Sequence, residues 1–193
     1  MKRILTVVVL VAITAFAAKA QEFKKFKVGL GAGYAMTSGE GAKAGVLLYL
    51  EPAYRVQDQI LVGLRLEGAA VVRGYAESVE TGSVSASFSG SQALFGQYYF
   101  SNSTFRPFVG VGLGLNKVST AAASFNGEAF AAVNESKFGF FPRVGADIGH
   151  FTISIDVNLI GASKLTGTSG TELTTKNNYI GIRMGGFFGG GRK

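Results

Sequence analysis

Among the charged residues that have an apolar or glycine neighbour on both sides, eight lie within stretches of alternating apolar residues and have the clearest capacity for chemistry; we call them the flanked charges. They are Glu51, Arg65, Glu67, Arg106, Arg143, Asp147, Asp156 and Arg183. A free carboxylate can act as a general acid or base, whereas carboxylates packed against arginines form ion pairs. The chain has one histidine, His150, and no cysteine, so it has no His/Cys metal cluster. The residue types therefore favour a structural role for these charges, with no enzyme activity and no catalytic, cofactor or metal site.

The stretch over residues 105–116 indicates what kind of element carries such charges. Val109, Val111 and Leu113 alternate there with glycines at every second position. A period of two is that of a β-strand, and repeated glycine argues against a helix. A face of small residues opposite a face of bulky apolar residues suits a narrow closed barrel whose bulky side chains point to lipid.

The same alternation predicts eight strands, over residues 27–36, 44–54, 60–72, 85–100, 105–116, 138–148, 151–159 and 177–188. The connections after the second, fourth and sixth strands are short, and the others are mostly longer, including an irregular segment predicted at 117–137 and a polar loop predicted at 161–176. Short turns at one end and long loops at the other are typical of outer-membrane barrels, and an even strand number permits closure. We therefore predict an all-β fold, an eight-stranded antiparallel up-and-down transmembrane β-barrel.

The first twenty residues match a cleavable secretory signal peptide. Lys2 and Arg3 precede an apolar run over residues 4–18, and Ala18-Lys19-Ala20 is a small-x-small cleavage site. The run is shorter than the ~20 residues that a spanning helix needs. The expected organisation is a signal peptide over residues 1–20 and a barrel domain over residues 21–193, with both termini in the periplasm.

On these strand registers all eight flanked charges point into the barrel. Four arginines against four carboxylates allow complete pairing, which predicts a structural plug of salt bridges; the alternative is a selectivity constriction in a narrow pore. Lys27 and Arg55 are assigned to the end with the short turns, and His150 to a solvated turn there. The remaining charges form no basic stripe, so nucleic-acid binding is not expected.

Two other functions stay open. The apolar segments 121–125 and 130–133 can line an extracellular pocket for a small apolar solute, which makes a conduit the second hypothesis, or they can simply extend strands above the membrane. A soluble, secreted lipocalin-like barrel is the third. The absence of tryptophan and the apolar outward faces argue against it.

Three stretches carry a resemblance to a known group: R-P-F-V-G-V-G-L-G at 106–114, F-F-P-R-V-G-A-D-I-G at 140–149 and Y-I-G-I-R-M-G-G-F-F at 179–188. With them the chain resembles the small eight-stranded outer-membrane barrels of Gram-negative bacteria, the OmpA/OmpX/OmpW-like porin-family proteins. The resemblance implies an outer-membrane location and contact with outer-membrane lipid and lipopolysaccharide. It also implies handling by periplasmic chaperones and the barrel-assembly machinery, which reads a terminal aromatic residue; here Phe188 is followed by a glycine-rich tail. A few relatives are lipid-modifying enzymes, but His150 lies at the wrong end for such a site.

Overall fold

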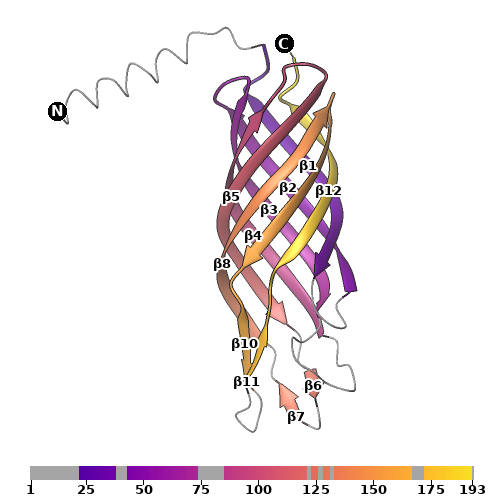
Figure 1. Ribbon diagram of the computed structural model, residues 1–193, viewed down its shortest axis with the longest axis vertical. Coiled ribbons are helices and arrows are strands. Elements are labelled where there is room, and N and C mark those ends of the chain that lie inside the picture. The colour runs from indigo at the N-terminus through magenta and orange to yellow at the C-terminus, as the bar shows by residue number, and fades with distance from the viewer. Residues whose placement is uncertain are drawn as a thin grey trace, which may run out of the picture.

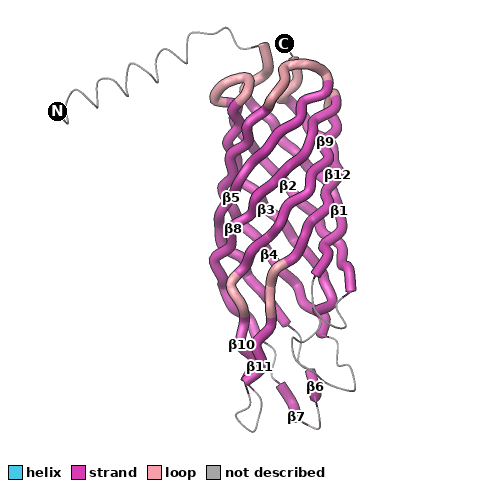
Figure 2. The backbone as a smooth tube through the Cα atoms, viewed as in Figure 1, coloured by secondary structure: helices cyan, strands magenta, loops and turns pink. Residues whose placement is uncertain are grey.

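The computed structural model describes residues 22–37, 43–73, 85–120, 123–125, 128–130, 133–166 and 172–192. Eight long antiparallel strands close into a barrel in the order β1-β12-β9-β8-β5-β4-β3-β2 (Figures 1 and 2). They are β1 (Phe26–Thr37), β2 (Lys43–Arg55), β3 (Ile60–Arg73), β4 (Ser85–Tyr99), β5 (Phe105–Thr120), β8 (Val133–Ile148), β9 (Phe151–Ile160) and β12 (Tyr179–Gly189). The predicted fold class is confirmed. No helix in the described part of the chain has the length and hydropathy of a membrane span.

Four short strands lie beyond the barrel at the end opposite the termini (Figure 1). β6 (Ala123–Phe125) pairs with β7 (Glu128–Phe130), and β10 (Ser163–Thr166) pairs with β11 (Glu172–Thr175). The prediction of an irregular segment at 117–137 and a polar loop at 161–176 was therefore wrong in part. These strands are only three or four residues long, which is too short for an alternation of apolar residues to reveal them in the sequence. Residues 121, 122, 131 and 132 of the predicted apolar pocket lie outside the described residues.

The strand registers are as predicted. On β3, Leu64 and Leu66 lie on the outer face, whereas Arg65 and Glu67 are buried inside. The pairing of β3 with β4 runs without a shift from Ile60–Tyr98 to Arg73–Ser85. Because directly paired residues point to the same side of a sheet, this register places Leu64 and its partner Leu94 together on the outer face that meets lipid.

The small inner face of β5 makes room for large side chains on its neighbour β8. A Cβ atom added at Gly112 would overlap the ring of Phe141, and one added at Gly110 would touch Cδ of Arg143 at 3.5 Å. Two clusters of buried apolar side chains fill much of the remaining interior. One surrounds Val71 and Val118 toward the loop end, and the other surrounds Phe108 and Phe141. The barrel interior is therefore a packed core in which the charges are embedded.

Candidate functional site: a buried charge network in the barrel lumen

All eight of the flanked charges are buried, none being more than 9% exposed. They come from six different strands, because each strand places its inward residues in the same lumen. The structure joins six of them in one network: Glu51, Arg65, Glu67, Arg143, Asp156 and Arg183. The other two, Arg106 and Asp147, lie closer to the termini and form no ion pair with these six; both contact Tyr99, which Gln97 links to Arg143.

Arg143 on β8 connects three side chains of the network. Its Nη2 donates to Oε1 of Glu51 at 2.6 Å and its Nη1 donates to Oε2 of the same carboxylate at 3.1 Å. Its Nε donates to Oδ2 of Asp156 at 3.2 Å, and Nη1 also donates to Oε1 of Gln97 at 2.9 Å. A two-point contact between a guanidinium and a carboxylate is the strongest form of such a pair, and it fixes the orientation of both groups.

Asp156 on β9 is fully buried and faces three guanidinium groups. Arg183 Nη1 lies 2.5 Å from Oδ2, Arg65 Nη1 donates to Oδ2 at 2.9 Å, and Arg143 approaches from the third side. Three cations around one carboxylate would repel each other if they had no other partners. Arg143 and Arg183 each have a second carboxylate, Glu51 and Glu67 respectively, which balances much of this charge.

On the β3 side of the network, Glu67 and Arg65 contact uncharged side chains in addition to their ion-pair partners. Glu67 accepts hydrogen bonds from Nε and Nη2 of Arg183 at 2.7 and 2.5 Å, and a further one from the hydroxyl of Tyr179. Arg65 donates through Nη2 to Asn158 at 2.8 Å, and its guanidinium lies 3.5 Å from the ring centroid of Phe141. The ring face attracts the cation, so Arg65 is stabilised by an aromatic contact as well as by an ion pair.

Asp147 pairs with Lys27, which was predicted only to lie at the end with the short turns. Lys27, at the start of β1, is buried and places Nζ 2.5 Å from Oδ2 of Asp147. Asp147 also accepts hydrogen bonds from Tyr99 at 2.8 Å and from Thr152 at 2.5 Å. The four-carbon stem of Lys27 lets the ammonium reach inward along the lumen, so a position near a strand end did not mean exposure to water.

Arg106 differs from the expected pattern, because among the described residues it forms no ion pair. It donates to the backbone oxygens of Ser101 at 3.1 Å and Asp58 at 2.5 Å. Its guanidinium lies 3.8 Å from the ring centroid of Phe23, and that of Arg55 lies 5.2 Å from the same ring. Arg55, which was assigned to the end with the short turns, is fully buried. The expected four-to-four pairing is therefore replaced here by stacking on an aromatic ring from outside the strands.

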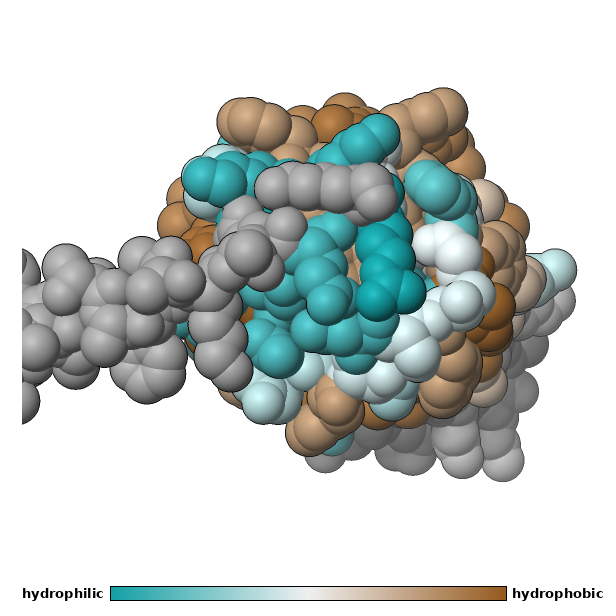
Figure 3. All heavy atoms as spheres, turned by 90° about the horizontal axis from the view of Figure 1, so that it is seen from above, coloured by the Kyte–Doolittle hydropathy of each residue, from teal (hydrophilic) through white to brown (hydrophobic). Residues whose placement is uncertain are grey.

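Phe23 is held in the mouth of the barrel by Asp58 and by the segment 190–192. The backbone amides of Glu22 and Phe23 donate to the carboxylate of Asp58 at 3.0 and 3.2 Å, and Phe23 forms a bridge with Arg192. Gly190 has a φ of 60° and donates to the backbone oxygen of Phe26 at 2.6 Å. The glycine-rich tail thus turns back over the mouth. Viewed from this end, hydrophilic residues gather in the centre and hydrophobic ones surround them (Figure 3).

Little space remains between the charged groups. A cavity between Lys27, Glu51 and Gln97 measures about 10 Å³. That is roughly the volume that one water molecule needs. The described residues contain no group of three or more His, Asp or Glu side chains placed to hold a metal ion. His150 is exposed in the β8–β9 turn, with its ring 5.3 Å from that of Phe187.

Comparison with known proteins agrees with this architecture. OprG from Pseudomonas aeruginosa has 15% sequence identity and a TM-score of 0.59 over 88% of this chain and 98% of its own. Neisserial surface protein A has 18% identity and a TM-score of 0.56 over 84% of this chain and 94% of its own. At these identities the likeness concerns the fold alone. The comparison with curated protein sequences found no significant match. Residues 4–188 match the family described as the outer membrane protein beta-barrel domain, and the chain belongs to that family.

Proposed function

We propose that this protein is a structural barrel of the Gram-negative outer membrane with a sealed lumen, and that it interacts with its surroundings through its loop end. The observation that carries the proposal is the network that joins Glu51, Arg143, Asp156, Arg183 and Glu67 across the interior. Each of the four lumen carboxylates accepts at least two hydrogen bonds, so none is a free base. We accordingly propose no catalytic role.

The energy needed to open the lumen supports a plug over a pore. A passing ion must displace a carboxylate or a guanidinium from its partner, and removing one partner of a buried pair costs roughly 3–5 kcal/mol. The two-point contact of Arg143 with Glu51 would have to break, together with the bond from Arg143 to Gln97. A narrow pore for small solutes is the alternative that the same residues leave open, because charged rings also select ions.

The loop end offers the surface for interaction. β5 and β8 remain paired as far as Thr120 and Val133, and the β10–β11 hairpin projects beside them (Figure 1). We propose that this end faces the outside, where lipopolysaccharide surrounds it, and that both termini lie in the periplasm. Removal of residues 1–20 as a signal peptide, escort by periplasmic chaperones, and recognition of Phe188 by the assembly machinery belong to the same proposal.

A liposome-swelling assay tests the sealed lumen with neutral solutes. Vesicles that contain the folded protein should swell in an isotonic solution of a small sugar or amino acid no faster than vesicles without protein. A double variant, Glu51→Ala with Arg143→Ala, removes the strongest contact and leaves space in its place, and it should admit the smallest solutes. Rapid swelling of vesicles with the unmodified protein would contradict the sealed lumen and would favour the pore hypothesis. Protease treatment of intact cells tests the orientation, because only the loop end should be cleaved.

A further inference from the structure

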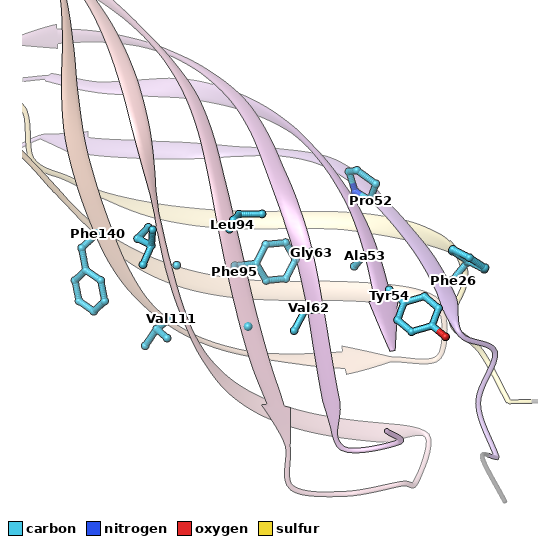
Figure 4. A pocket seen from close by; sticks show the side chains of 13 residues that line it. Phe26, Pro52, Ala53, Tyr54, Val62, Gly63, Leu94, Phe95, Val111 and Phe140 are labelled. Atoms are coloured by element: carbon cyan, nitrogen blue, oxygen red, sulfur yellow. The ribbon is translucent and has the colours of Figure 1, made fainter. Parts of the chain in front are cut away.

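A groove on the outer wall crosses from the end of β1 to β8 (Figure 4). It has a volume of about 700 Å³ and an almost wholly apolar lining. The groove follows one row of cross-strand partners, in which Tyr54 opposes Val62, Val62 opposes Gly96 and Gly96 opposes Val111. Gly96 is the gap in this row, since a Cβ atom added there would meet no atom within 4 Å.

The groove runs obliquely from the end of the barrel that carries the termini toward the middle of the barrel wall. Phe26 and Tyr54 lie at the ends of β1 and β2 next to the termini, whereas Phe140 lies well inside β8, whose terminal end is Ile148 (Figure 4). With strands ~4.8 Å apart, the five steps from β1 to β8 span about 24 Å. A second apolar hollow of about 430 Å³ shares Gly96 with the first, so the depression widens at this glycine.

Two exposed cations lie at the end of the groove that is nearest the termini. Lys24 and Lys25 directly precede Phe26, whose ring stacks edge-on against Tyr54 at a centroid distance of 5.3 Å. The backbone oxygen of Lys25 accepts a hydrogen bond from the amide of Arg55 at 2.7 Å, which fixes this segment beside the end of β2. Lysines next to an apolar barrel wall place their ammonium groups at the level of lipid phosphates.

We propose that the groove binds one glycerophospholipid of the leaflet nearest the termini, with an acyl chain in the groove and the phosphate at Lys24 and Lys25. A slender, flexible chain can follow a depression that rises obliquely from the headgroup level to mid-membrane. A second barrel fits it less well, because its wall is convex and covered with large side chains. The anionic headgroup complements the two lysines, which an uncharged ligand would not do.

Two glycines on β4 provide a matched pair of variants. Gly96→Leu fills the groove from an unobstructed position. Gly90→Leu adds the same side chain on the same face of the same strand, where only the ring of Phe88 lies within 4 Å. Gel migration with and without heating should show that both variants fold.

The test uses the full folded protein with added phosphatidylglycerol and counts the lipids retained in native mass spectrometry. Wild type and Gly90→Leu should each retain one phospholipid, and Gly96→Leu should lower its retention by about tenfold, the effect of losing contacts to one or two buried methylenes. Replacing Lys24 and Lys25 by glutamine should lower the retention of phosphatidylglycerol and leave the retention of diacylglycerol, which has no phosphate, unchanged. No retained lipid in wild type, or equal retention in the two leucine variants, would overturn the site. The site would also be overturned if the wild-type protein formed dimers and Gly96→Leu abolished them, because the groove would then bind a second copy of the chain. If the variant with glutamine at both lysines retained as much phosphatidylglycerol as the wild type, the phosphate could not be assigned to Lys24 and Lys25.

Discussion

Arg143 and Glu51 form a two-point ion pair across the full width of the barrel, with donor–acceptor distances of 2.6 and 3.1 Å. Their strands, β8 and β2, are four positions apart in either direction around the ring of strands. Arg65 and Asp156 likewise come from opposite strands, β3 and β9, and meet at 2.9 Å. The lumen is therefore cross-braced between opposite walls, and neighbouring strands are not held by their backbone ladders alone.

Replacing Arg143 by methionine should destabilise the folded barrel by roughly 3–5 kcal/mol, because Glu51 is left as a buried carboxylate without its main partner. The midpoint of urea unfolding, followed by the shift in gel migration, measures the loss. Glu135→Gln is the matched control, since its pair with Lys137 at 3.0 Å is partly exposed and should contribute less than ~1 kcal/mol. Equal shifts in the two variants would mean that the lumen pair has no special weight.

Exchanging polarity at adjacent positions of β3 tests the register. Leu64→Arg should disfavour assembly by roughly 2–3 kcal/mol, because it puts a cation into lipid. Arg65→Leu should keep the lipid contacts and should lower the stability of the folded barrel, because Asp156 loses one of its cationic partners. Membrane fractionation and heat-dependent gel migration report both. Normal assembly of Leu64→Arg, together with loss of Arg65→Leu from the membrane, would require the opposite register, since a one-residue slip exchanges the two faces.

Alanine at two glycines should have opposite consequences. Gly112→Ala places a methyl group against the ring of Phe141, which supports Arg65, so overpacking should cost about 1–3 kcal/mol. Gly96→Ala faces open space and should be close to neutral. Urea unfolding of the two variants side by side gives the comparison. A larger loss for Gly96→Ala would show that the inner face of β5 is not the tightly packed one.

The alternation of residues was enough to predict the barrel and the inward direction of Arg65, Glu67 and Arg143, because a strand of known period has only two faces. It did not predict Lys27 and Arg55 as lumen residues. Both lie near strand ends, where alternation says nothing of how far a long side chain extends along the barrel axis. Their burial depends on Asp147, Tyr99 and the mouth, which come from distant parts of the chain.

The partner of Arg106 was also beyond sequence reasoning. Phe23 lies outside any predicted strand, and it is held near Arg106 by Asp58, which accepts a hydrogen bond from its backbone amide, and by its bridge with Arg192. The short strands β6, β7, β10 and β11 were missed for a different reason. Each has only three or four residues, so no alternation of apolar residues is long enough to be recognised.

Phe23→Ala should release the segment that covers the mouth, because the ring packed against Arg55 and Arg106 anchors it. Trypsin should then cleave after Lys24 and Lys25 several times faster than in the unmodified folded protein. Phe26→Ala is the control: that ring is exposed on the outer wall, so its removal should leave the cleavage rate almost unchanged. Cleavage that is equally fast in wild type and in Phe23→Ala would contradict the anchored mouth.

Single-channel recording in planar lipid bilayers tests the sealed lumen most directly. If the lumen is sealed as proposed, folded wild-type protein should insert without producing stable conductance steps, because ion pairs join Arg143 to Glu51 and Asp156 across the interior and the nearby cavity has room for about one water molecule. The Glu51→Ala, Arg143→Ala double variant should produce small steps under the same conditions. Long-lived, uniform open channels from the wild-type protein would contradict the account and assign the same eight charges to a pore.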